Sequence, residues 1–160
     1  MYFRIGGIPA HPLVIHAVVI FVPLLIIGAI VYALIPAWRG RIGWAVLALA
    51  VIAPVSALLA KLSGQNLRTH LINSHFSGTI IAKINQHMGY GNMTLWLSIA
   101  LGVVTLGLAG YLWRTVPAGS SESVTVRAVG AVATVALGAV LGYYVFRTGD
   151  TGAHIVWSGI

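Results

Sequence analysis

The chain has 160 residues, of which 59 % are hydrophobic and 7 % are charged. Soluble domains carry about 25 % charged residues, so this composition excludes an ordinary soluble globular protein. The formal net charge of +7 comes from Lys and Arg near the ends of apolar runs, a pattern typical of lipid head-group contact and membrane topology and not of nucleic-acid binding. Cysteine is absent, which excludes disulfides, iron–sulfur clusters and thiol catalysis.

Four long apolar runs organise the chain, at about 13–35, 42–62, 93–113 and 128–146. Each is long enough to cross a hydrocarbon core of about 30 Å as a helix. None shows the alternation of a barrel strand, so helices are the expected spanning structure. The first run is too long for the apolar part of a cleaved signal, and we expect it to stay as a helix. The sequence therefore predicts one all-α domain over residues 1–160, an integral membrane four-helix bundle.

The connections between these runs differ in length and polarity. Residues 35–44 predict a tight turn, and residues 114–127 predict a longer one. The remaining connection, residues 63–92, is polar, and its stretch "LRTHLINSHFSGTIIAKINQHM" has amphipathic character. We expect this stretch to include a helix lying in the membrane interface.

All six histidines are expected on one side of the membrane. Consecutive spans alternate in direction, so the start of the first, the end of the second, the start of the third and the end of the fourth share one side. Every histidine falls at one of these places: His11, His16, His70, His75, His87 and His154. For His70, His75 and His154 we expect ordinary interfacial residues that bond to water or to a backbone carbonyl.

His16 and His87 are the predicted ligands of a cofactor. His16 lies about one turn inside the first apolar run, and a polar residue there is expected to face the bundle interior and to be functional. His87 leads into the third run at a similar depth. Two imidazoles from different helices can hold a haem iron, each giving one nitrogen to the metal and the other to a hydrogen bond. We therefore expect a haem b, with His16 and His87 as axial ligands.

His11 is expected to play a different part. It lies five residues before His16, which is about 140° round a helix and 7–8 Å along it, so the two cannot easily bind one metal ion. We expect His11 at the surface as a cap or a haem propionate partner, aided by Arg4 or Arg68. Copper or zinc is the alternative, because imidazole suits both metals.

The shortage of acids excludes other chemistry. Glu122 and Asp150 are the two carboxylates of the chain, so a carboxylate dyad close together is not expected and a Ser–His–Asp arrangement would have to use Asp150. No glycine-rich nucleotide fingerprint occurs between a strand and a helix. Electron transfer needs few titratable side chains, because the cofactor carries the chemistry.

Several pieces of the chain resemble a known family. They are "GGIPAHPLVIHAVVIFVPL" at 6–24, "PAWRGRIG" at 36–43, "SGQNL" at 63–67, "HMGYGN" at 87–92 and "TGDTGAHIVW" at 148–157. In this order they resemble the bacterial membrane proteins grouped as domain of unknown function 2231, most closely their actinobacterial members. The resemblance singles out His11, His16, His87 and residues 149–152.

The family resembles two-haem, four-helix b-type cytochromes, which implies haem and a place in the bacterial inner (plasma) membrane. Many relatives have a histidine in "GHSG" where this chain has Asp150. The resemblance therefore implies one haem here, with Asp150 as a residue that orients a ligating histidine.

The charge distribution predicts an orientation and completes the hypothesis. Short distal turns hold Arg39, Arg41, Arg114 and Arg127, which favours a cytoplasmic location for these turns and an outside location for both termini. We expect a b-type cytochrome-like electron carrier that contacts membrane lipids, quinol and other respiratory-complex subunits. The alternatives are a cofactor-free accessory subunit of a membrane complex and a copper- or zinc-binding protein.

Overall fold

The computed structural model describes residues 4–75, 78–115 and 123–157. The main elements are four long helices: α1 Ala10–Leu34, α2 Arg39–Asn73, α3 Thr79–Thr115 and α4 Val124–Trp157. A short 3-10 helix, η1 Pro36–Trp38, joins α1 to α2. All four long helices are long and apolar enough to cross a membrane. The predicted all-α four-helix bundle is confirmed.

A small β-hairpin precedes α1. Strands β1 Arg4–Ile5 and β2 Ile8–Pro9 pair antiparallel, with Arg4 opposite Pro9. Between them Gly6 and Gly7 have φ angles of 57° and 83°. Two consecutive residues with positive φ are what a tight hairpin turn requires, and glycine adopts this conformation without steric cost.

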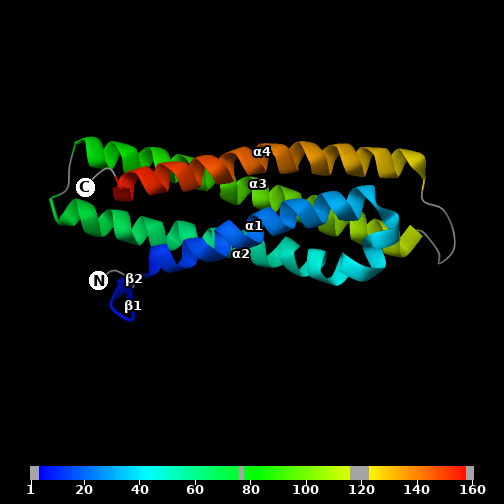
Figure 1. Cartoon of the computed structure of the whole chain (residues 1–160), viewed down its shortest axis with the longest axis horizontal. Helices are drawn as coiled ribbons and strands as arrows, with labels where there is room; N and C mark the ends of the chain where they lie inside the picture. Colours follow the sequence, from blue (N-terminus) through cyan, green and yellow to red (C-terminus); the bar gives the residue numbers. More distant parts are fainter. Residues whose placement is uncertain (1–3, 76–77, 116–122, 158–160) are drawn as a thin grey trace.

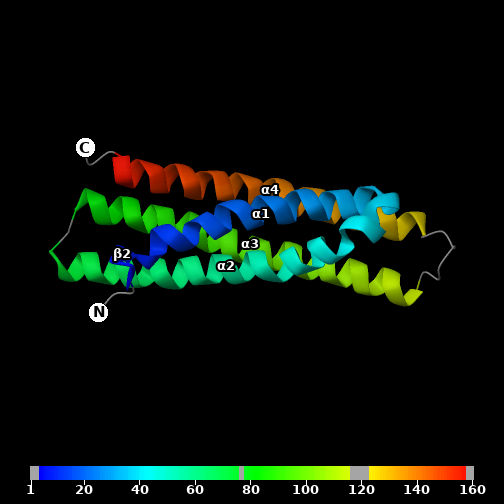
Figure 2. The ribbon, with the colours of Figure 1, turned by 60° about the horizontal axis from the view of Figure 1, so that its bottom comes forward.

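The helices run alternately in opposite directions around a common axis. Each helix packs mainly on its two neighbours, α1 on α2, α2 on α3, α3 on α4 and α4 on α1, so α1 and α3 lie on a diagonal. The β-hairpin and the C-terminal end of α4 lie at the end of the bundle where α2 ends and α3 begins (Figures 1 and 2). The starts of α1 and α3 and the ends of α2 and α4 therefore share this end, as the alternation of spans predicts.

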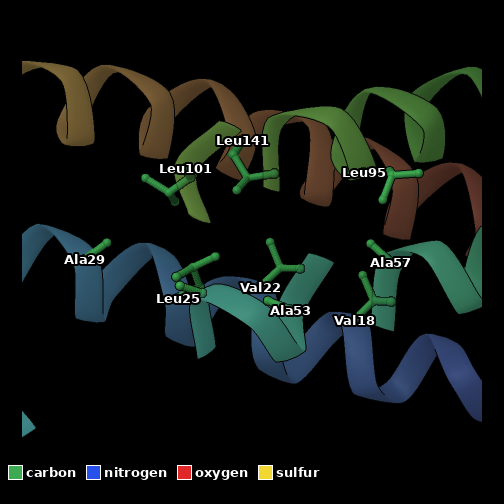
Figure 3. Packing of buried hydrophobic residues seen from close by; sticks show 10 residues of the cluster. Val18, Val22, Leu25, Ala29, Ala53, Ala57, Leu95, Leu101 and Leu141 are labelled. Atoms are coloured by element: carbon green, nitrogen blue, oxygen red, sulfur yellow. The ribbon is translucent and has the colours of Figure 1, made fainter. Parts of the chain in front are cut away.

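The core is mainly apolar, includes a few buried Ser and Thr side chains, and contains many small residues. Val22, Leu25, Ala53, Leu101 and Leu141 have no exposed surface, and they converge from all four helices (Figure 3). Large apolar side chains also cover the outside, among them Val103 and Val132, 64 % and 69 % exposed. An apolar exterior around a small-residue core is the arrangement of helices that pack in lipid.

The predicted interfacial helix is not a separate element. In the described residues, α2 continues to Asn73 and α3 already begins at Thr79. The hydropathy pattern marks only the part of a helix that lies in hydrocarbon. The helix itself continues as long as its backbone N–H and C=O groups form hydrogen bonds along it. The two polar extensions lie side by side and project beyond the ends of α1 and α4 (Figures 1 and 2).

The distal turns are described in part. The tight turn between α1 and α2 is confirmed, and the Arg39 guanidinium donates to the carbonyl oxygens of Tyr32 and Ala33 at 2.8 and 3.2 Å. Residues 116–122 of the longer turn, which include Glu122, lie outside the described residues.

Candidate functional site: a histidine pair between diagonal helices

Two of the six histidines meet inside the bundle. His11, in the first turn of α1, and His87, in the third turn of α3, have ring centroids 6.2 Å apart and ring planes at 81°. Both residues are partly buried. Their helices are diagonal partners that start at the same end of the bundle, so both side chains reach the space between the two hairpins.

Hydrogen bonds to α2 fix the ring of His11. Its Nδ1 lies 3.0 Å from the carbonyl oxygen of Ala60 and 3.2 Å from Oγ of Ser63. A carbonyl oxygen can only accept, so Nδ1 carries the proton and donates. The Ser63 hydroxyl gives its own hydrogen to the same carbonyl at 3.0 Å, and its oxygen is left to accept from the ring. In the neutral ring, Nε2 therefore keeps a free lone pair.

The ring of His87 is fixed in the same way by α4. Its Nδ1 lies 3.2 Å from Oγ1 of Thr151, and the backbone of Thr148 also hydrogen-bonds to the ring. The Thr151 hydroxyl donates to the carbonyl oxygen of Arg147 at 2.7 Å, so its oxygen accepts from the imidazole. His87 Nδ1 is again the donor, and Nε2 again keeps its lone pair.

A glycine makes room for each ring. A Cβ added to Gly64 in α2 would lie 3.0 Å from Cε1 of His11, and a Cβ added to Gly152 in α4 would lie 3.0 Å from Cε1 of His87. Contacts this short are tighter than ordinary van der Waals packing. Each imidazole therefore lies directly against the backbone of the neighbouring helix.

His16 lies outside this site. Its side chain is exposed, and its Nδ1 bonds to the carbonyl oxygen of Pro12 in its own helix at 2.7 Å. The prediction that His16 faces the bundle interior is wrong. The inward face of α1 carries His11, Val18 and Val22, and a residue five positions after His11 is turned about 140° from it. His11, expected at the surface, has the inward position instead.

The carboxylate of Asp150 forms ion pairs with Arg147 and His154, and not with His11 or His87. Its oxygens lie 3.3 Å from a guanidinium nitrogen of Arg147 and 3.3 Å from Nδ1 of His154. The residue that orients His87 is Thr151, one position further along α4. The cofactor-binding role expected for Asp150 therefore stays a prediction.

The comparison with known families agrees with this architecture. The family described as "Predicted membrane protein (DUF2231)" matches residues 7–159. The chain belongs to this family. Neither the curated proteins nor the solved structures gave a match.

Other polar side chains of this DUF2231 protein surround the pair. The hydroxyls of Thr94 and Thr148 are 3.0 Å apart and join α3 to α4. The Arg147 guanidinium lies over the ring of Tyr90, 5.1 Å from its centroid, and its Nε is buried with no hydrogen-bond partner. His70, His75 and His154 are exposed, as expected.

The donor set is small. Among the described residues, no group of three or more His, Asp or Glu is placed to hold a metal ion. The pair thus offers two imidazole nitrogens, each with its second nitrogen engaged by the neighbouring helix. The residues that engage them, Ser63 and Thr151, were not predicted, although each stands directly before a glycine within a stretch that resembles the family.

Proposed function

We propose that this membrane protein holds one haem b between Nε2 of His11 and Nε2 of His87 and takes part in electron transfer. The observation that supports the proposal is the histidine pair, in which both Nδ1 atoms donate to the protein. Histidines that bind a metal usually donate their other ring nitrogen in this way. His11 replaces His16 as the first proposed ligand.

The separation of the rings is consistent with a single metal ion between them. A metal–imidazole bond of about 2.0–2.1 Å puts the ring centroid about 3.2 Å from the metal. Two rings on opposite sides of one ion would then have centroids about 6.4 Å apart. The observed separation is 6.2 Å.

The number of ligands favours a group that brings its own donors. Zinc takes three or four protein ligands, and the described residues offer no such cluster. Haem has four ring nitrogens and needs only two axial ligands from the protein. A haem bound there would supply one-electron redox chemistry. Copper(I), which can be held by two nitrogens, is the second candidate.

Arg147 is the proposed partner of an acidic group of the cofactor. Its buried Nε has no hydrogen-bond partner, and it lies one turn before Thr151 in α4. Arginine binds carboxylates well because its planar guanidinium presents several donors. Arg68, the expected partner, bonds instead to Asn85 at 2.8 Å in the extension of α2 and α3.

We also propose that the histidine end faces outside the cytoplasm. Arg39, Arg41 and Arg114 lie close to helix ends at the opposite side, and short basic turns favour the cytoplasm. This orientation suits electron exchange between quinol in the membrane and an external acceptor within a respiratory assembly.

The test is the visible spectrum of the detergent-purified protein, oxidised and then reduced with dithionite after expression with added haem. We expect a sharp Soret band and resolved α and β bands, typical of six-coordinate haem. His11→Ala and His87→Ala should each lower the bound haem at least tenfold. His16→Ala is the matched control from the same helix and should leave the spectrum unchanged.

Two other outcomes would refute the haem proposal, and a third would refute only the assignment of His11 as a ligand. No haem bands together with about one copper per chain would favour the copper site. No haem bands and no metal would favour a cofactor-free accessory subunit, in which the pair serves helix packing. Loss of haem in His16→Ala but not in His11→Ala would restore the ligand set expected from the sequence.

A further inference from the structure

The two halves of the chain repeat one arrangement of three residues. His11 in α1 bonds to the hydroxyl of Ser63 and lies against Gly64 in α2. His87 in α3 bonds to the hydroxyl of Thr151 and lies against Gly152 in α4. In both halves the hydroxyl comes directly before the glycine, and the Nδ1–oxygen distance is 3.2 Å.

The buried positions of the first helix of each half follow the same register. A shift of 76 residues, the separation of His11 and His87, relates α1 to α3. Five buried residues of α1 coincide under this shift with five buried residues of α3. The pairs are Val18 with Thr94, Val22 with Ser98, Leu25 with Leu101, Ala29 with Thr105, and Ala33 with Ala109.

The second helix of each half gives an independent check. A shift of 88 residues, the separation of Gly64 and Gly152, relates α2 to α4. All three described buried residues of α4 coincide with buried residues of α2. The pairs are Val46 with Thr134, Ala50 with Gly138, and Ala53 with Leu141.

The tightest contacts between the halves are also related. A Cβ on Gly102 would lie 2.5 Å from the carbonyl oxygen of Ala50, which joins α3 to α2. Under the shift of 76 residues Gly102 of α3 corresponds to Ile26 of α1, and under the shift of 88 residues Ala50 of α2 corresponds to Gly138 of α4. A Cβ on Gly138 would lie 3.1 Å from Cγ2 of Ile26, which joins α4 to α1. The halves are therefore two copies of one helical hairpin, related by a pseudo-twofold axis along the bundle, as in parallel membrane repeats.

We infer that the site consists of two equivalent half-sites, His11–Ser63–Gly64 and His87–Thr151–Gly152, which present their Nε2 atoms to one ligand on the pseudo-twofold axis. In each half-site the hydroxyl accepts the proton of Nδ1, and the glycine lets the ring lie against the helix. Ser63 and Thr151 are positioning residues. The identity of the ligand rests on the proposed function. The position of the proton on each imidazole ring does not.

The position of the proton on each imidazole ring is tested on the haem-free protein. Histidine labelled with ¹⁵N, in micelles of the full chain, reports by long-range ¹H–¹⁵N correlation which ring nitrogen carries the proton. The signals are assigned by their loss in His11→Ala and His87→Ala. We expect the Nδ1–H form for both residues, whereas a free neutral imidazole favours Nε2–H. An Nε2–H form at either residue would overturn the inference, whether or not haem binds.

Glycine variants test the equivalence of the half-sites. Gly64→Ala should disturb the signals of His11, and Gly152→Ala those of His87, because the new methyl group meets the ring edge. Gly149→Ala is the control, since a Cβ at Gly149 meets nothing within 4 Å. With added haem, Gly64→Ala and Gly152→Ala should each weaken binding about tenfold, and Gly149→Ala less than twofold.

The two proposals fail in different ways. Wild-type protein that binds no haem but shows both rings as Nδ1–H refutes the haem proposal and supports the half-sites. Wild-type protein that binds haem but loses it in only one of the two glycine variants refutes the equivalence of the half-sites. Haem loss in both glycine variants, with both rings as Nδ1–H, supports both.

Discussion

Single glycines decide how closely these helices approach. Gly102 faces the backbone of α2, where an added Cβ would lie 2.5 Å from the carbonyl oxygen of Ala50. Backbone that is fixed in a helix cannot move aside as a flexible side chain can. Gly107, in the same helix, has nothing within 4 Å of its Cβ position.

We therefore expect opposite effects from the same substitution at these two positions. Gly102→Ala should lower the free energy of unfolding by about 1–3 kcal/mol, because it overpacks the interface. Gly107→Ala should leave it unchanged or raise it by up to about 1 kcal/mol through helix propensity. Reversible unfolding in mixed micelles measures both. Equal effects of the two variants would show that α2 and α3 are not in this close contact.

The histidine site shows what the sequence can and cannot predict at the scale of a residue. The alternation of spans places all six histidines on one side, and His87, one of the two predicted ligands, lies in the histidine pair. The choice between His11 and His16 failed because apolar residues cover every face of α1. A helix without a polar face gives no periodicity from which the inward direction can be read. The partners Ser63 and Thr151 lie 52 and 64 residues from their histidines, a distance that local spacing does not reveal.

At the scale of an element, α2 and α3 are longer than their apolar runs. From Gly64 to the end of α2 at Asn73 the helix rises about 14 Å. Two hydrogen bonds join α2 to α3. One runs from Lys61 Nζ to Oδ1 of Asn92 at 2.7 Å, and the other from Arg68 Nε to Oδ1 of Asn85 at 2.8 Å. The first is partly buried and the second is exposed.

These two bonds should differ in strength. Double-mutant cycles with Lys61→Met and Asn92→Leu should give a coupling energy of about 1.5 kcal/mol, as for a hydrogen bond from a charged group that is partly shielded from water. Arg68→Ala with Asn85→Ala should give about 0.5 kcal/mol or less, because water competes for both groups. Urea or thermal unfolding in detergent gives the energies. A stronger coupling in the second cycle would mean that lipid or another part of the chain covers the extension.

The predicted helices and the structure differ mainly at their ends. Hydropathy located all four spans because the hydrocarbon core excludes charge. The polar remainder of α2 and α3 gives no such signal, since its helical state depends on the pairing of the two extensions. The turn between α1 and α2 was predicted correctly because Pro36 follows directly on an apolar run.

At the scale of the whole molecule, the orientation in the membrane can be tested directly because the chain has no cysteine. Ser74→Cys places one thiol at the exposed tip of α2, and Val124→Cys places one at the opposite end, where Val124 is 83 % exposed. In intact cells, a membrane-impermeant maleimide should label Ser74→Cys and should not label Val124→Cys.

Labelling after the cells are opened is the control and should be equal for the two variants. The reverse pattern in intact cells would put the histidine end in the cytoplasm and would remove the proposed external electron acceptor. Labelling of neither variant in opened cells would mean that both thiols are covered by other subunits.

The even number of spans in each hairpin has a consequence for the origin of the chain. A segment that crosses the membrane twice returns to the side on which it entered, so two copies in tandem insert with the same orientation. Two separate copies of an ancestral hairpin would then meet about the same axis and bring both imidazoles together without any reorientation. A homodimer of half the present length would already have contained the complete site, and gene fusion would have preserved it while freeing each half to diverge.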